Sequence, residues 1–210
     1  MVLVQFYTAT QKQIETVLDF LKASHPEITA LLYVVNPKRN DTIYDQEVIC
    51  YHGRDYIVEL MEGLHFKINA KSFYQTNSEQ AYSLYKITRD FAGLTGNEIV
   101  YDLYTGTGTI AQFVAKKARK VIGIEAVPDA IKAAKENALH NKIQNVDFFV
   151  GDMKRIFNDT FIETHGHPDV VITDPPRDGM HKEVVQQILK IAPSQICLLY
   201  TSPSPRDHQP

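Results

Sequence analysis

The sequence predicts an α/β protein whose larger part is a doubly wound parallel sheet. Three observations indicate this fold: strand and helix patterns alternate after residue 97, a glycine loop joins the first of these strands to its helix, and 44% of the 210 residues are apolar. A smaller α+β region precedes the alternation. We expect an α+β region at residues 1–76, the sheet at 77–196 and a non-native tail at 197–210.

The N-terminal region begins with strand-like residues directly after Met1, so we expect the native N-terminus to lie further upstream. A weak capping box at Thr10 starts a helix that ends before Pro26, and a strand follows over Ala30–Val35. Three more strand-like runs come next. We expect the first two to form a hairpin and the third to pair beside them: Glu47–Tyr51, Tyr56–Met61 and His65–Asn69.

The second region alternates strands with helices at a spacing typical of crossover connections, which make neighbouring strands parallel. Strands are expected at Glu98–Asp102, Lys120–Glu125, Val146–Val150, Val170–Thr173 and Gln195–Tyr200. Helices are expected at Ser78–Leu94, Ile110–Ala118, Pro128–His140, Met153–Thr164 and Lys182–Ile191.

Composition excludes several classes of protein. A formal charge of −3 argues against a uniformly basic nucleic-acid module. The two cysteines, Cys50 and Cys197, cannot make a disulfide framework, which suits a reducing cytoplasm. His165 and His167 lack a third metal ligand in the sequence nearby, and no apolar run is long enough for a bilayer. We therefore expect a cytoplasmic protein that binds neither a metal nor a membrane.

The glycine loop lies in VYDLYTGTGTIA, where Gly106 and Gly108 separate an apolar strand from a helix. Glycines let the backbone approach a ligand closely, and the start of the helix offers free N–H groups. G-x-G-x-x-A alone fits either NAD or S-adenosylmethionine, or a tight turn without a ligand. Glu125 follows about twenty residues later, where a carboxylate can bind both ribose hydroxyls. Asp152 is expected either near an adenine amino group or as a helix cap.

The fourth predicted strand of the sheet favours S-adenosylmethionine over NAD. VVITDPPRDG places Asp174 and two prolines at the carboxyl end of this strand, at the expected switch point of the sheet. Stiff backbone there fixes a carboxylate beside cofactor and substrate. Many S-adenosylmethionine enzymes that methylate bases have an acid or amide before Pro-Pro at this place, whereas a dehydrogenase has no need of it.

Four motifs in order, KSFYQTNSEQA, DLYTGTGTI, VIGIEAVPDAI and ITDPPRDGM, resemble those of the bacterial RNA uracil-5-methyltransferase family, in particular its ribosomal-RNA branch. The resemblance extends from Met1 to about Ile196. It implies an S-adenosylmethionine cofactor, an RNA partner and a Rossmann-like methyltransferase sheet that lacks its last strands here. Thr105 stands where the family often has cysteine. The resemblance implies four residues as cofactor contacts: Gln75, Tyr104, Glu125 and Asp174. We expect the loop glycine Gly106 and the acid after the third strand, Asp152, to bind the cofactor as well.

The resemblance also implies where the nucleophile lies. Uracil C5 is a poor nucleophile, so a thiolate must first add to C6, and a base must later remove the C5 proton. The family carries this cysteine in a Ser-Cys-Asn-Pro turn after the fifth strand and the base, a glutamate, further on. At that place the chain has CLLYTSPSPRD, which resembles the translation of a transposase sequencing adapter. We therefore expect a C-terminal truncation that removes both groups and leaves this chain inactive.

Two other functions fit the residues. A methyltransferase that acts on an exocyclic amine would use Asp-Pro-Pro-Arg as its acceptor site and would need no cysteine. A catalytically silent module that binds RNA or a nucleotide would need only the glycine loop and its acids. The product nucleoside distinguishes the amine methyltransferase from uracil C5 methylation. A native tail that lacks Ser-Cys-Asn-Pro would indicate the silent module.

Overall fold

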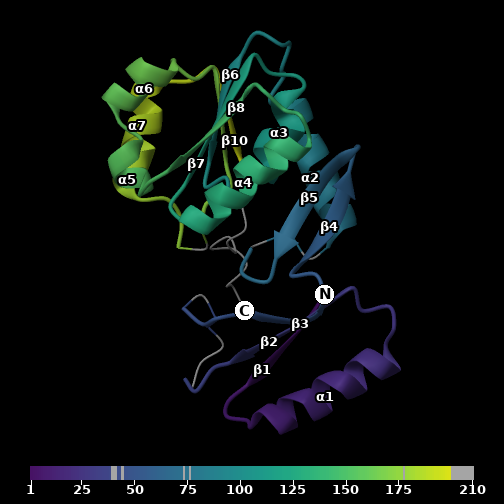
Figure 1. Cartoon of the computed structure of the whole chain (residues 1–210). Helices are drawn as coiled ribbons and strands as arrows, with labels where there is room; N and C mark the ends of the chain where they lie inside the picture. Colours follow the sequence, from purple (N-terminus) through teal and green to yellow (C-terminus); the bar gives the residue numbers. More distant parts are fainter. Residues whose placement is uncertain (39–41, 44, 73, 76, 177, 200–210) are drawn as a thin grey trace, which may run out of the picture. The chain divides into compact units, whose positions relative to one another are not determined.

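The structure is a computed structural model, which describes residues 1–38, 42–43, 45–72, 74–75, 77–176 and 178–199. The chain forms two compact units, one of Met1–Leu60 with Phe66–Ser72, and the other of Met61–His65 with Phe73–Pro210. Figure 1 shows their elements along the chain. The division expected between residues 76 and 77 stays a prediction.

The first unit contains a three-stranded sheet with one helix packed against it. β1 runs parallel to β2, and β2 runs antiparallel to β3, with an irregularity between Leu31 and Leu32. Thr10 makes the expected capping box, and Ile14 and Leu18 of α1 are buried against the sheet. The elements are β1 (Val2–Phe6), α1 (Gln11–Ser24), β2 (Ala30–Val35), β3 (Ile49–Gly53), β4 (Tyr56–Met61) and β5 (Leu64–Asn69).

The predicted hairpin between Glu47–Tyr51 and Tyr56–Met61 is wrong. β3 pairs with β2, whereas β4 pairs with β5, so that only the expected pairing of the third run is confirmed. Gly53 explains the difference, because it has a φ of +76° and a Cβ there would lie 2.3 Å from the Thr29 carbonyl oxygen. The next N–H, that of Arg54, donates to the same oxygen at 3.2 Å. The end of β3 is thereby held against the start of β2.

The second unit contains a five-stranded parallel sheet in the order β10-β9-β6-β7-β8, which confirms the doubly wound α/β fold. α3 and α4 lie on one side of this sheet, and α5, α6 and α7 lie on the other (Figure 1). The tip of the β4–β5 hairpin, Met61–His65, belongs to this unit. Its elements are α2 (Ser78–Phe91), β6 (Ile99–Leu103), α3 (Thr109–Ala115), β7 (Lys120–Glu125), α4 (Pro128–His140), β8 (Val146–Val150), α5 (Met153–Ile156), α6 (Asp159–His165), β9 (Val170–Thr173), α7 (Lys182–Ile191) and β10 (Gln195–Leu198).

Two predicted elements of this unit differ from the structure. The single helix expected over Met153–Thr164 is divided into α5 and α6, because the Asn158 side chain caps a new helix by accepting the Phe161 N–H at 3.0 Å. The strand expected over Gln195–Tyr200 ends at Leu198. Tyr200 and the tail after it lie outside the described residues.

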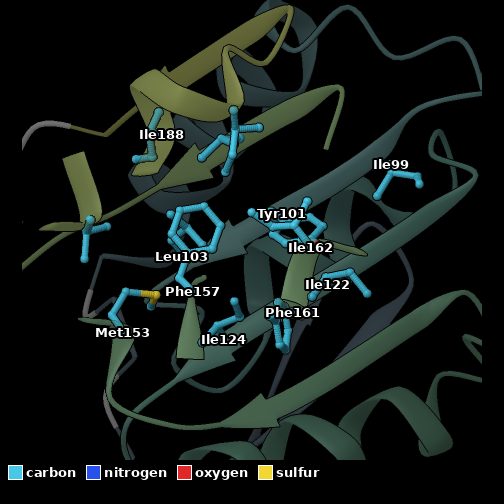
Figure 2. Close-up of a cluster of buried hydrophobic side chains, with 13 residues drawn as sticks. Ile99, Tyr101, Leu103, Ile122, Ile124, Met153, Phe157, Phe161, Ile162 and Ile188 are labelled. Atoms are coloured by element: carbon cyan, nitrogen blue, oxygen red, sulfur yellow. The ribbon is translucent and has the colours of Figure 1, made fainter. Parts of the chain in front are cut away.

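The main core lies between the sheet and the helices α5, α6 and α7 (Figure 2). β6 contributes alternate residues to it, Ile99, Tyr101 and Leu103, as expected for a strand whose side chains alternate between the two faces of a sheet. The same alternation directs Asp102 to the opposite face, where its carboxylate binds the N–H of Ala111 in α3. In the parts of the chain that the structure describes, no helix is both long and apolar enough to cross a membrane.

Candidate functional site

The candidate site lies where the direction of the strand connections changes. β6 lies between β7 and β9 in the sheet, and the chain leaves β6 toward α3 and leaves β9 toward α7 on the opposite face. Parallel sheets bind ligands in the crevice that such a divergence opens beyond the carboxyl ends of the strands. The glycine loop follows β6, and Asp174 follows β9, so the structure brings these two predicted features to neighbouring strand ends.

The two loop glycines have different roles. A Cβ on Gly108 would lie 2.6 Å from Phe148 Cζ and 2.9 Å from Ala134 Cβ, so this position admits no side chain. A Cβ on Gly106 would meet no atom within 4 Å. Both have a positive φ, +55° for Gly106 and +75° for Gly108. Gly108 therefore allows the loop to pack, whereas Gly106 leaves open space in front of its backbone.

Glu125 closes the loop from the end of β7. Its Oε2 accepts the Gly106 N–H at 3.1 Å, and its Oε1 accepts the N–H groups of Ala126 at 2.8 Å and Val127 at 3.0 Å. A carboxylate has about four lone-pair positions. One position therefore remains beside the three backbone donors, and a ligand that donates two hydroxyls must displace one of these donors.

Tyr104 occupies the first position of the loop with a φ of +62°, which is rare outside glycine. Burial raises the pKa of its hydroxyl, and the charges of Asp152 and Glu125 raise it further. These three predicted residues therefore lie close together. Asp152 also caps α5, because its Oδ1 accepts the Lys154 N–H at 3.1 Å, so its role toward an adenine stays a prediction.

Asp174 presents a buried acceptor. Its Oδ1 is shielded from solvent, and none of the described residues donates a hydrogen bond to it. Burial raises the pKa of this carboxyl. An unsatisfied buried acceptor costs about 1–3 kcal/mol, a cost that a ligand donor can remove. Gln75 lies half-buried in the segment between β5 and α2.

Sequence reasoning missed Asp102 and gave Thr105 little weight. Asp102 is only 1% exposed, and its Oδ2 accepts the Thr105 hydroxyl at 2.5 Å and the Ala111 N–H at 3.0 Å. One N–H in the first turn of α3 is therefore occupied, contrary to the free groups expected there. Burial raises the pKa of Asp102 to about 7, and the charges of Asp174 and Glu125 contribute. The signal in the sequence was a lone carboxylate in the otherwise uncharged strand IVYDL.

The remaining candidates have structural partners. Cys197 is buried with its Sγ 3.9 Å from the Thr88 carbonyl oxygen, and burial raises the pKa of its thiol, so it does not resemble an activated nucleophile. The His165 ring lies 4.4 Å and 4.3 Å from the ring centres of Phe149 and Phe161. Among the described residues, no group of three or more potential ligands could hold a metal ion.

Comparisons with known proteins agree with this fold. The chain is 60% identical over 204 residues to an uncharacterized RNA methyltransferase of Porphyromonas gingivalis, an alignment that covers 97% of this chain and 44% of the relative. It is 59% identical over 187 residues to an uncharacterized RNA methyltransferase of Bacteroides thetaiotaomicron, covering 89% of this chain and 41% of that one. The chain thus spans less than half the length of these relatives.

A solved structure with a similar fold is the Pyrococcus abyssi tRNA (uracil-54, C5)-methyltransferase in complex with S-adenosyl-L-homocysteine. It superposes with a TM-score of 0.69 at 27% identity, over 84% of this chain and 42% of that chain. The family model described as a methyltransferase domain matches residues 94–207, which include the glycine loop, Glu125, Asp152 and Asp174. This match covers more than half of the sequence, and the chain belongs to the methyltransferase-domain family.

Proposed function

We propose that this chain is the cofactor-binding part of an S-adenosylmethionine-dependent methyltransferase that modifies C5 of a uridine in RNA, ribosomal RNA in particular. S-adenosylmethionine is the cofactor, and it supplies an electrophilic methyl group. The observation that carries the proposal is the convergence of the glycine loop, Glu125 and Asp174 at the carboxyl ends of three adjacent strands.

The residues present fit this cofactor. Gly106 leaves open space before its backbone, and Asp174 Oδ1 is a buried acceptor without a protein donor. In the proposal, Glu125 accepts the ribose hydroxyls, and Tyr104 and Asp152 lie near it. Gln75 and Asp174 complete the contacts, and both also face the uracil, as the family resemblance implies.

Uracil as the target base is supported by the motif resemblance and by the similarity to a tRNA (uracil-54, C5)-methyltransferase. The same resemblance assigns the nucleophilic cysteine to a turn that corresponds to residues 201–203, which lie outside the described residues. The buried Cys197 is not proposed for this role.

RNA as the partner is supported by the relatives' names and by a surface cluster in the first unit. The Arg54 guanidinium lies 5.2 Å, and the Lys67 ammonium 4.3 Å, from the ring centre of Tyr56. Cationic side chains such as these can bind the phosphate groups of RNA. Replacing Arg54 and Lys67 together by alanine should weaken RNA binding and flatten its salt dependence, and unchanged binding in a filter assay would remove this surface from the proposal.

Calorimetry with S-adenosylhomocysteine tests the cofactor site. Glu125→Ala should weaken binding by about 1–3 kcal/mol, because it removes the acceptor for the ribose hydroxyls. Glu136→Ala, at an exposed position of α4, is the matched control and should bind like the unmodified chain. Equal affinity of Glu125→Ala and the control, or tight competition by NADH, contradicts the assignment.

The reaction is tested in the Porphyromonas gingivalis relative and in a chimera in which residues 1–196 of this chain replace the matching segment and the relative's own sequence follows. Each is incubated with labelled S-adenosylmethionine and with ribosomal or transfer RNA, and the product nucleosides are identified by mass spectrometry. The proposal expects 5-methyluridine in ribosomal RNA. Label in transfer RNA corrects the substrate, a methylated exocyclic amine corrects the target atom, and the absence of label from both proteins indicates a silent binding module.

A further inference from the structure

We propose that Asp102 and Thr105 are positioning residues of the cofactor site, which together hold the glycine loop in the conformation that receives S-adenosylmethionine. This inference rests on the proposed function. It assigns a role to two residues outside the expected cofactor contacts, and it depends on a hydrogen-bonded unit that joins the end of β6 to the loop and to α3.

The geometry supports the role directly. A single oxygen, Asp102 Oδ2, accepts the Thr105 hydroxyl at 2.5 Å and the Ala111 N–H at 3.0 Å. These donors precede and follow Gly106, so the carboxyl fixes the loop on both sides of its open glycine. The Thr105 N–H also donates to the Ile124 carbonyl at 3.0 Å. This bond fixes the backbone of Thr105 and so the position from which its hydroxyl reaches Asp102.

A purely structural role explains this arrangement poorly. Asp102 is 1% exposed, and none of the described residues donates to its second oxygen, Oδ1. Burying a carboxyl with one oxygen unpaired is costly, and an apolar residue would fill the same space without that cost. The presence of a carboxyl here is therefore best explained by the two donors that it positions.

Ionisation of Asp102 should strengthen the unit, because a carboxylate is a better hydrogen-bond acceptor than a neutral acid. Among the described residues, three titratable groups act on this carboxyl or are influenced by it: Asp174 after β9, Glu125 after β7 and Tyr85 of α2. Burial and these two acidic charges raise the pKa of Asp102 to about 7. The loop should therefore be held more firmly as the pH rises through neutrality.

The first experiment compares threonine variants by calorimetry with S-adenosylhomocysteine. Thr105→Val keeps the shape and removes the donor, and should weaken binding about tenfold. Thr105→Ser restores a hydroxyl and should return the affinity to within about twofold of the unmodified chain. Thr88→Val, a buried threonine whose hydroxyl binds the Leu84 carbonyl inside α2, is the matched control. Equal affinities for Thr105→Val and Thr88→Val, or no rescue by serine, overturn the inference.

The second experiment measures the pH profile. Affinity of the unmodified chain should rise at least about threefold from about pH 6 to about pH 8, while Asp102→Asn should show no such rise. Titration of the ligand is common to both proteins and cancels. A rise that persists in Asp102→Asn assigns the titration to another group, such as Asp174, and overturns the role of Asp102. If the unmodified chain does not bind the ligand at all, the proposed cofactor site fails instead.

Discussion

The two faces of the five-stranded sheet both bury apolar residues, but they differ in how many polar residues they bury. The face toward α5, α6 and α7 carries a continuous cluster of thirteen apolar or aromatic side chains. Of these, Tyr101 has a hydrogen-bonding group, and it donates to the Gly166 carbonyl at 2.8 Å. Thr173 of β9 is a buried polar residue on the same side, with its hydroxyl 3.6 Å from the Met180 sulfur. Six other buried polar residues of this unit lie on the side of α3 and α4 and in the loop between β6 and α3: Asp102, Thr105, Thr107, Thr109, Gln112 and Asn137.

This difference separates stability from binding within one sheet. The free energy gained from apolar packing grows with the buried area and depends little on the position of any single atom. Buried polar groups gain only when each donor meets an acceptor, so they define positions more sharply. We infer that the α5–α7 face mainly stabilises the fold, while the α3 side sets the geometry of the glycine loop. Three predictions test this division.

The largest effect is expected on the apolar face. Phe161 packs its ring 5.1 Å from that of Phe149 and 6.1 Å from that of Tyr101, measured between centres. Phe161→Ala should lower the free energy of unfolding by about 3–5 kcal/mol, because it leaves a cavity in the core. Denaturant titration measures this loss, and calorimetry should find the affinity of the folded fraction for S-adenosylhomocysteine unchanged. A tenfold loss of affinity instead would contradict the division between the faces.

A smaller effect is expected from the two loop glycines, which form a matched pair. Gly108→Ala should destabilise the chain by about 2–4 kcal/mol, through a strained φ and a clash with Phe148. Gly106→Ala meets no protein atom within 4 Å, so its stability loss should stay near about 1 kcal/mol. It should nevertheless weaken S-adenosylhomocysteine binding, because its methyl group enters the open space. Equal behaviour of both variants in denaturation and calorimetry rejects the distinction.

The third prediction is a pH dependence of stability. The folded chain holds the pKa of Asp102 at about 7 against an ordinary value of 3.8, so between these values it binds more protons than the unfolded chain. The contribution of Asp102 to the unfolding free energy is therefore greatest below about pH 4 and is lost as the pH rises to about 7.

Asp102→Asn should remove this part of the slope. Arg89 and Tyr82 lower the pKa of Glu62 to about 2, so the opposing loss of stability from Glu62 occurs below pH 4.5, largely outside this window. Unfolding free energies measured from about pH 4.5 to about pH 7 provide the check. Parallel slopes in the two proteins would show that Asp102 is not the titrating group.

Much of the second unit could be predicted because its signals are local. Alternating apolar residues, the glycines of the loop and the acids that follow each strand lie within short windows of sequence, where the 2- and 3.6-residue periods and turn chemistry act. The strands of the sheet were found to within one or two residues, and the parallel order follows from the crossovers. The break between α5 and α6 was missed because Asn158 acts as a cap only after the chain has turned there.

By itself, the sequence determined the class of fold, the position of the glycine loop and the need for glycine in it, because these depend on neighbouring residues. Only the tertiary structure decided which strands pair and which acids meet. β3 joins β2 because the Thr29 carbonyl reaches Gly53 and Arg54 across the sheet. The pKa of Asp102 is raised first by burial and then by the charges of Asp174 and Glu125, which the strand order brings to either side of β6. Burial by residues distant in sequence is a property of packing that no local pattern contains.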